Sequence, residues 1–276
     1  DPVEMLLEDN SIKGKARDLL KMVQRNALAL QQLVGSILDF RKIQNGKMDL
    51  ELYRFDLVKA LTLWTSDFLL AAERKHIMLH LDVEEFKRQG KIVADKEKIA
   101  RVVFNLLSNA LKYTPVGGDI FVSLKMVDPH QVKGLSAETI NSYKDFLRID
   151  VRDTGKGISN EEAEKVFERF FQAKGAASGT GIGLALVKSF VELHHGKAWV
   201  ESETDKGSDF IVVIPCKQMA DSIVIHNDDE TVDNSESSSL SAGKEMINES
   251  DLQYIDDGNK QSGKLQKLLD EQGTKP

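Results

Sequence analysis

Apolar residues recur at intervals of three and four along residues 11–45. This spacing places them on one side of a single long helix, and Leu33 and Phe40 make the stripe wider than that of a two-stranded coiled coil. A stripe of this width favours a helix of a four-helix bundle, with a lone helix packed on the following domain as the alternative. Asn45-Gly46 is typical of a helix C-terminus.

After this helix the pattern predicts a mixture of helices and strands. Asp56 and Asp95 precede helical apolar spacing, so we expect them to cap a helix at 57–75 and the helix that contains residues 104–115. Alternating or continuous apolar runs predict strands at 77–83, 119–127, 146–151, 198–203 and 209–214. The predicted fold class is therefore α+β, a long bundle helix followed by an α/β sandwich with a mixed sheet and one helical layer.

Two segments depart from this pattern. Residues 128–145 exceed a normal hairpin connection and are interpreted as an insertion without catalytic duty, in which Ser136-Ala137-Glu138 starts a short helix. From residue 217 the periodicity fails, and residues 217–276 hold 13 acidic and 6 basic residues, as is typical of a flexible segment. We therefore expect a helical region at 1–47, an α/β domain at 48–216 and an acidic tail or linker at 217–276.

Polar side chains gather beside the apolar stripe of the helix at 104–115. They are Asn105, Asn109, Lys112 and Tyr113. An amide oxygen can ligate a hard cation, an ammonium group can meet a phosphate and an aromatic ring can stack on a base, so this group suits a magnesium nucleotide. An amphipathic helix with an ordinary polar face is the alternative if no other segment agrees.

Two glycine-rich segments do agree. One is Asp153-Thr154-Gly155-Lys156-Gly157-Ile158, after a predicted strand, and the other is Gly179-Thr180-Gly181-Ile182-Gly183-Leu184, which opens a helix. With Phe167 and Phe170 between them, the motifs follow the order N box, G1 box, F box and G2 box. Over roughly residues 11–215 the chain resembles sensor histidine kinases, whose nucleotide-binding domain has the histidine kinase-like ATPase (Bergerat) fold of GHKL proteins.

The resemblance implies a role for each N-box residue. Asn109 matches the magnesium ligand, and Asn105, one helical turn earlier, supports the water shell of the metal. Lys112 would reach phosphate and, with Asn105, forms the expected catalytic group. Tyr113 would cover the adenine. ATP and Mg2+ are the implied cofactors.

The resemblance assigns the rest of the nucleotide to the later boxes. Asp153 resembles the carboxylate that accepts the adenine amino group, and the glycines that follow it let the main chain pass close to the base. The G2 glycines would expose amides at a helix start, where the helix dipole favours phosphate. The implied nucleotide-binding residues here are Asp153, Gly155, Gly157, Ile158, Phe167, Phe170, Gly179, Thr180, Gly181, Gly183 and Leu184.

Residues 159–180 are interpreted as a mobile lid, because small residues stand beside the aromatic anchors Phe167 and Phe170. A plain loop is the alternative. Arg169 and Lys174 are candidates for phosphate contact when the lid closes.

The phosphate-accepting histidine of the family has no match in this chain. It would lie on the first helix of the dimerisation hairpin, of which Pro2–Glu8 resembles a remnant, whereas the first histidine is His76. His76 and His80 lack an orienting partner nearby in sequence and are interpreted as surface residues. We therefore interpret the chain as a fragment whose acceptor lies upstream, and expect a homodimer through the bundle and a response regulator or receiver domain as partner.

Two other functions stay open. Gyrase, the mismatch-repair ATPases and the heat-shock chaperone of ninety kilodaltons share these boxes, but carry at the position of Asn105 a glutamate that activates water for hydrolysis. An amide cannot accept that proton, so the sequence favours phosphoryl transfer. A pseudokinase that acts as a dimerisation module is the third hypothesis.

Composition bears on partners and location. The net charge of −7 equals 6 − 13, the balance of residues 217–276 alone, so the rest of the chain offers no basic excess for nucleic acid. The single cysteine, Cys216, excludes an internal disulfide and fits a reducing compartment. No apolar run approaches the ~20 residues that span a bilayer. We expect a cytoplasmic fragment of a membrane-bound sensor, in which only upstream segments would meet the membrane.

Overall fold

The computed structural model describes residues 2–9, 11–84, 86, 91–173, 180–218 and 226–227. Within these ranges the chain divides into two compact units, one up to Gln32 and one from Leu33 onward. The predicted tail therefore lies almost wholly outside the described residues, and the three predicted regions stay a prediction. No helix in the described ranges is long and apolar enough to cross a membrane.

Two helices open the chain, α1 (Pro2–Glu8) and α2 (Lys15–Gln44). The second agrees with the long helix predicted from the apolar stripe. The turn after Gln44 contains Gly46, whose φ of +60° is the left-handed conformation that closes many helices. Apolar side chains such as Leu30 and Val34 stay exposed on α2, at 60% and 48%. Within the part of the chain that the structure describes, the stripe that predicted a bundle helix is thus left uncovered at these positions.

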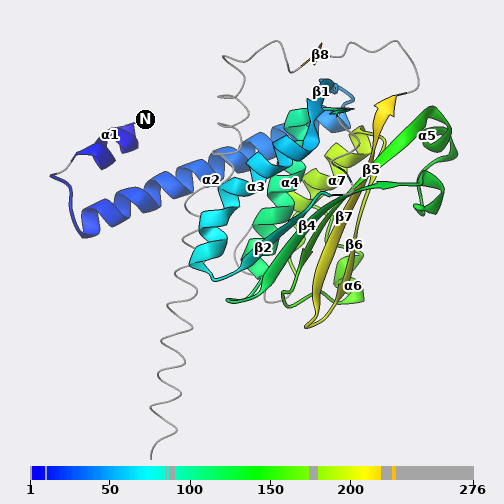
Figure 1. Ribbon diagram of the computed structural model, residues 1–276. Helices are drawn as coiled ribbons and strands as arrows, with labels where there is room; N and C mark the ends of the chain where they lie inside the picture. The colour runs from blue at the N-terminus through cyan, green and yellow to red at the C-terminus, as the bar shows by residue number, and fades with distance from the viewer. Residues whose placement is uncertain are drawn as a thin grey trace, which may run out of the picture. The chain divides into compact units, whose positions relative to one another are not determined.

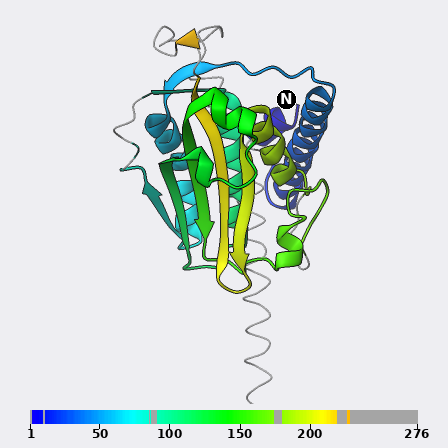
Figure 2. The same cartoon turned by 90° about the vertical axis from the view of Figure 1, so that its right-hand side faces the viewer.

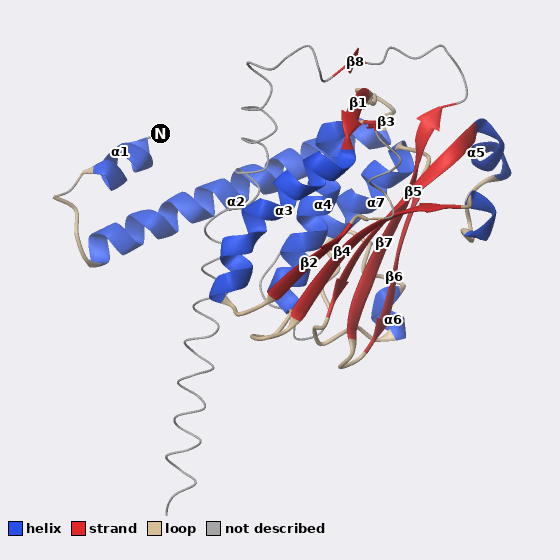
Figure 3. Cartoon of the chain, viewed as in Figure 1, coloured by secondary structure: helices blue, strands red, loops and turns tan. Residues whose placement is uncertain are grey.

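The second unit is built on a five-stranded mixed sheet (Figures 1 and 3). Strand β2 pairs parallel with β4, and every other neighbouring pair is antiparallel. This confirms the predicted α+β class with a mixed sheet. In spatial order the strands are β2 (Met78–Asp82), β4 (Asp119–Val127), β5 (Tyr143–Asp153), β7 (Gly207–Gln218) and β6 (Lys197–Glu203).

One face of the sheet is covered by α3 (Leu57–Arg74), α4 (Lys96–Tyr113) and α7 (Gly183–Leu193), as Figures 1 and 2 show. Asp56 and Asp95 cap the first two helices through their side chains, as predicted. The apolar stripe of each helix packs on the sheet, and this burial forms the main core. The helical layer holds the N box on α4 next to α7, which begins in the G2 box.

The insertion between β4 and β5 covers the opposite face at one end of the sheet. It contains a short 3-10 helix, η1 (Pro129–Gln131), and α5 (Ala137–Ser142), which Ser136 caps as expected. Val132 and Leu135 pack against a second small core formed by Phe146, Ile211 and Val213.

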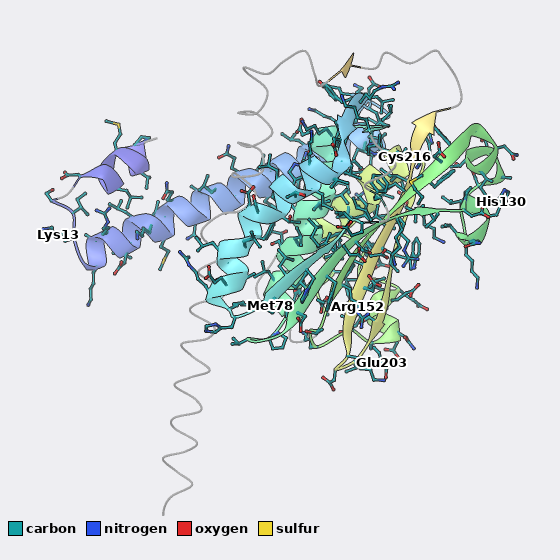
Figure 4. The ribbon with its side chains drawn as sticks, in the orientation of Figure 1. Lys13, Met78, His130, Arg152, Glu203 and Cys216 are labelled. Carbon is teal, nitrogen blue, oxygen red and sulfur yellow. The ribbon has the colours of Figure 1, made fainter. Side chains whose placement is uncertain are left out.

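This end of the sheet lies away from the G1 box. In the β4–β5 ladder Val127 pairs with Phe146 at the insertion, whereas Ile120 pairs with Asp153 at the other end. Figure 4 shows the same separation, with His130 of the insertion far from Glu203 at the end of β6. That the insertion has no catalytic duty stays a prediction.

Several short elements escaped the sequence patterns. A small sheet joins β3 (Lys91–Ala94), β1 (Tyr53–Asp56) and β8 (His226–Asn227), and a four-residue helix, α6, spans Asn160–Ala163 within the predicted lid. Strands of two to four residues are too short to display a period of two. The aspartate that caps α3 also ends β1, so the strand was hidden by the helix signal.

The two histidines near β2 differ from each other. His76 is exposed with a φ of +54°, as a surface residue at a helix end. His80 has a partner from a neighbouring strand, because its Nε2 lies 2.8 Å from an oxygen of Asp119 and its ring stacks on Phe121 at 4.5 Å. The prediction from nearby sequence missed this partner, since it is 39 residues away.

Candidate functional site

The N box and the G2 box meet where α4 passes the start of α7. The side-chain nitrogen of Asn105 donates to the Arg101 carbonyl at 2.7 Å. A Cβ atom added to Gly183 would lie 2.5 Å from Oδ1 of Asn105, so a larger residue at this position would displace the Asn105 side chain. No side chain caps the start of α7. Its first N–H groups and the positive end of the helix dipole therefore lie next to Asn105 and favour an anion.

The other end of α4 meets the G1 box. A Cβ atom on Gly155 would lie 2.6 Å from the Tyr113 carbonyl oxygen. The hydroxyl of Thr154 accepts from the Asp119 N–H at 2.8 Å and lies close to Gly118. These contacts join the glycine loop to the turn that follows α4. The fold thus places three sequence-distant boxes along one side of α4.

Asp153 is the buried acid of the site. Asp153 is only 3% exposed, and its Oδ1 accepts a hydrogen bond from the Gly155 N–H at 2.7 Å. Burial raises the pKa of Asp153, while hydrogen bonds from the main chain of Gly155 and Ser208 oppose that rise by favouring the carboxylate. A buried acceptor of this kind can select a ligand that brings its own N–H group.

The rest of the G1 loop packs on the β6–β7 hairpin. Gly157 has a φ of +62°, and a Cβ there would lie 2.0 Å from the Glu203 carbonyl oxygen. The Ile158 N–H donates to the hydroxyl of Ser202 at 2.9 Å. Ser202 was not predicted as part of the site. Its role depends on a contact over 44 residues, for which the local sequence gives no signal.

Two ammonium groups lie near the Tyr113 ring. Nζ of Lys112 is 5.0 Å from the ring centre and Nζ of Lys156 is 5.5 Å from it. Burial raises the pKa of the Tyr113 hydroxyl. The predicted cation and aromatic of the N box are thus together, and Lys156 from the G1 box is an additional cation that the sequence analysis did not assign.

The F-box segment is attached at two points. The ring of Phe167 packs edge-on against Phe210, with ring centres 6.3 Å apart, which agrees with an anchor. Phe170 is different, because its side chain is 65% exposed. Its main chain holds the segment instead: Phe170 has a φ of +61° and donates its N–H to the Gly181 carbonyl at 2.8 Å. The prediction of Phe170 as an apolar anchor is corrected accordingly.

The G2 box is described from Thr180 onward, where the threonine hydroxyl accepts from the Ile182 N–H at 3.4 Å. A Cβ on Gly181 would lie 2.7 Å from the main chain of Phe170, so this glycine permits the contact between the F and G2 boxes. Leu184 is half-buried in the first turn of α7. The predicted residues Gly179 and Lys174 lie outside the described residues.

Arg169 contacts the end of α2 within the second unit. Its guanidinium lies 4.8 Å from the ring centre of Phe40. Close by in sequence, Asp39 forms an ion pair with Arg101 of α4 at 2.6 Å. The helix before the domain is thus tied both to the F-box segment and to the helix of the N box. The predicted phosphate contact of Arg169 is not tested by this arrangement and stays a prediction.

The donor set fits a magnesium nucleotide better than a metal held by protein alone. Among the described residues no group of three or more histidine, cysteine or acidic side chains can hold a metal ion. Asn109 is half-buried on the same side of α4 as Asn105. Mg2+ commonly takes one or two protein oxygens and completes its shell with phosphate oxygens and water, so one amide is a sufficient protein contribution.

Comparisons with known proteins identify the family to which the chain is similar. Residues 94–218 match the family described as histidine kinase-, DNA gyrase B-, and HSP90-like ATPase. The hybrid signal transduction histidine kinase D of Dictyostelium discoideum is 33% identical over 78% of the chain, and the sensor histidine kinase TmoS of Ectopseudomonas mendocina is 33% identical over 82%. The chain spans 13% and 22% of the length of these two relatives.

Solved structures agree on the fold. Full-length ShkA in complex with AMPPNP superposes with a TM-score of 0.62 at 20% identity, covering 86% of this chain and 52% of ShkA. The histidine kinase ThkA in complex with the response regulator TrrA superposes with a TM-score of 0.52 at 21% identity, covering 78% of this chain and 56% of that chain. At these identities the likeness concerns the fold.

Proposed function

We propose that this chain, which is homologous to sensor histidine kinases, binds ATP and supplies the γ-phosphoryl group to a histidine outside this sequence. Its residues 94–218 form an ATPase domain of the histidine kinase-, DNA gyrase B- and HSP90-like family. One observation carries the proposal. The fold brings Asn105 to the uncapped start of α7 and brings Tyr113 to the glycine loop of Asp153, so one side of α4 offers contacts for both ends of a nucleotide.

Each residue then has a task. The Asp153 carboxylate accepts a hydrogen bond from the amino group of adenine, and the Tyr113 side chain covers the adenine ring. Lys112 and the first N–H groups of α7 bind phosphate oxygens. Asn109 would hold Mg2+, with Asn105 next to it, and the ion when bound supplies neutralisation of phosphate charge. In this arrangement the domain contributes positioning and charge, and the nucleophile comes from the acceptor histidine.

Transfer is favoured over hydrolysis by the chemistry of position 105. The family description includes ATPases that hydrolyse, so the domain match alone does not separate the two reactions. Asn105 is an amide and cannot take a proton from water, and the two relatives at 33% identity are both named as histidine kinases. The hydrolase therefore ranks below the kinase, and the presence of all four boxes ranks the pseudokinase lower still.

The proposal extends to partners and location. The exposed apolar side chains of α2 suit a homodimer through a helical bundle. A response regulator or receiver domain is the proposed recipient of the phosphoryl group, and ThkA, which shares the fold, was solved with such a regulator. A single cysteine, the buried Cys216, fits the reducing cytoplasm as the place of action.

Calorimetric titration with MgATP tests nucleotide binding. Asp153→Asn keeps the size of the side chain but replaces one carboxylate oxygen with an NH2 group, which cannot accept the adenine N–H, so we expect the Kd for ATP to rise at least about tenfold. Asp209→Asn is the matched control, because Asp209 lies next to Ser208 on β7 but points to the other face of the sheet. Equal ATP affinity in Asp153→Asn and the control would refute the assignment of Asp153.

Phosphate release tests the choice between transfer and hydrolysis. Asn105→Glu places a carboxylate where water can be activated, and we expect slow ATP hydrolysis to rise above that of the wild type. Asn105→Asp is the control, because aspartate has the size of asparagine and its carboxylate is one methylene shorter than that of glutamate. We expect a smaller rise in ATP hydrolysis in Asn105→Asp than in Asn105→Glu. If neither variant changes phosphate release, position 105 does not separate the two reactions.

A further inference from the structure

Lys75 is the one lysine among the described residues that is classed as buried, with 9% of its surface exposed. It follows α3 directly, and its Nζ donates to the main-chain carbonyl of Leu111 at 2.7 Å, across 36 residues of sequence. Burial lowers the pKa of Lys75. A lysine taken out of water in this way needs a partner for its charge, and here the partner is the last turn of α4.

The Leu111 carbonyl needs that partner as much as the lysine does. The last four carbonyls of a helix lack donors within the helix, and the next donor in line for Leu111 would be the N–H of residue 115. Residue 115 is a proline and has no N–H group. The preceding carbonyl, of Ala110, is satisfied by both the N–H and the hydroxyl of Thr114. Lys75 therefore supplies the donor that Pro115 cannot.

Lys75 also holds the far side of the same segment. Its own carbonyl accepts from the Gly117 N–H at 3.2 Å. The side chain and the main chain of one residue thus bracket residues 111–117, which include Lys112 and Tyr113. In addition, a positive charge at the C-terminal end of α4 is favourable to the helix dipole.

The bracketed segment is the one that meets the glycine loop. The Tyr113 carbonyl lies where a Cβ on Gly155 would touch it at 2.6 Å, and Gly118 lies against the Thr154 hydroxyl. A shift of a few tenths of an ångström in the end of α4 would therefore move Tyr113, Lys112 or the loop that carries Asp153. The end of α4 and the glycine loop are in close contact, so neither can shift without moving the other.

We propose that Lys75 is a positioning residue of the nucleotide site, which replaces the main-chain donor missing at Pro115 and so holds Lys112 and Tyr113 in place against the G1 loop. This inference rests on the proposed function, because the site it positions is the proposed ATP site. Lys75 does not touch the nucleotide itself.

The test compares MgATP affinity by calorimetry in three variants of the whole chain. Lys75→Met keeps the length of the side chain without its donors, and we expect the Kd to rise about tenfold because a buried carbonyl loses its partner. Lys75→Arg keeps charged donors and should stay within about threefold of the wild type. Val213→Ala is the control for stability, since it opens a cavity in the small core on the other face of the sheet. Its affinity should not change.

Hydrogen exchange without nucleotide supplies a readout that is independent of ATP. Lys75→Met should speed exchange of the Thr114 and Gly117 N–H groups, whereas Val213→Ala should not. If Lys75→Met does not fold, Lys75→Gln takes its place, because glutamine keeps a neutral donor. Lys75→Gln should lose less ATP affinity than is expected of Lys75→Met, and should also speed exchange of the Thr114 and Gly117 N–H groups. ATP affinity and exchange in the Lys75 variant equal to those of Val213→Ala would overturn the proposal. A wild type that binds no ATP but shows the exchange effect would reject the proposed function and leave the structural role of Lys75.

Discussion

At the scale of single residues, the site depends on glycines that allow main chains to touch. Gly157 and Gly46 have nearly the same backbone, with φ of +62° and +60°, but differ in surroundings. A Cβ on Gly157 would collide with the Glu203 carbonyl at 2.0 Å, whereas a Cβ on Gly46 meets nothing within 4 Å. Substituting Gly46 therefore tests the free-energy cost of the left-handed conformation alone. Substituting Gly157 adds the cost of the close approach to the Glu203 carbonyl.

We predict that Gly157→Ala lowers the free energy of unfolding by about 3 kcal/mol or more, and Gly46→Ala by only about 1 kcal/mol. Urea denaturation of the two variants and the wild type measures both. Equal losses would mean that the G1 loop moves freely away from the β6–β7 hairpin.

Asp209 gives a prediction about pH. Burial, with the neighbouring Asp150 as the next cause, raises the pKa of Asp209 to about 6, from an ordinary value of 3.8. The folded state therefore holds the proton more tightly than the unfolded state. Stability falls as the pH rises from about 4 to about 6, and the loss is complete above this window.

Asp209→Asn should remove this loss, because the amide carries no charge at any pH. Solvent screening limits the gain at pH 7 to about 1 kcal/mol, or about 2–4 °C in Tm. Thermal melts at pH 4 and pH 7 check it: the variant and the wild type should differ little at pH 4 and diverge at pH 7. A constant difference across this range would contradict the prediction.

At the scale of elements, α4 is the part on which the site is arranged, and its start is fixed by Asp95. Asp95 is 1% exposed and caps α4 through the Lys98 N–H at 3.0 Å, while its other oxygen accepts from the Glu51 N–H at 2.9 Å. Its own N–H donates to Nε2 of His194 at the end of α7. Burial lowers the pKa of His194, which favours the neutral ring that can accept this bond.

Asp95→Ala should therefore cost more than the loss of an ordinary cap. We expect about 2–4 kcal/mol, since the Lys98 and Glu51 N–H groups both lose their acceptor. Asp56→Ala is the control, because Asp56 caps α3 through a single N–H, that of Lys59, and should cost about 1 kcal/mol. Chemical denaturation of both variants decides it, and an equal cost would remove Asp95 from its central place.

The two interactions of Asp95, its cap on α4 and its bond to His194, show how much of these elements could be predicted from the sequence. The cap was predictable, because an aspartate before an apolar-periodic segment is a local signal. The bond to His194 was not, since it joins residues 99 apart and a histidine at a helix end has no local signature of burial. The same holds for Ser202 and Lys75, whose partners lie 44 and 36 residues away.

At the scale of the whole molecule, the order of the four boxes predicted the fold correctly, and the nucleotide site along α4 stays a proposal. The motifs were recognisable because each is a local pattern of glycine, amide or aromatic residues. The contacts between boxes come from the packing of α4 on α7 and on the G1 loop, which no single segment encodes. The β1–β3 pairing was missed for another reason, because its strands are too short to display a period of two.

The whole molecule also predicts where nucleotide should have no effect. The insertion lies at the end of the sheet opposite Asp153, and its Val132 and Leu135 pack on a core of their own. Its amides therefore serve as an internal reference for any change that ligand binding causes near α4.

Hydrogen exchange with and without MgATP tests the central claim most directly, because it reports on every box in one experiment. The account predicts that exchange slows together in the last turns of α4 (105–113), in the G1 loop (153–158) and at the start of α7 (180–184), while residues 129–142 of the insertion stay unchanged. At a nucleotide concentration close to the wild-type Kd, Asp153→Asn should weaken all three effects strongly, in line with a rise in Kd of at least about tenfold. Protection in only one of the three segments, or equal protection of the insertion, would contradict a single nucleotide site assembled along α4.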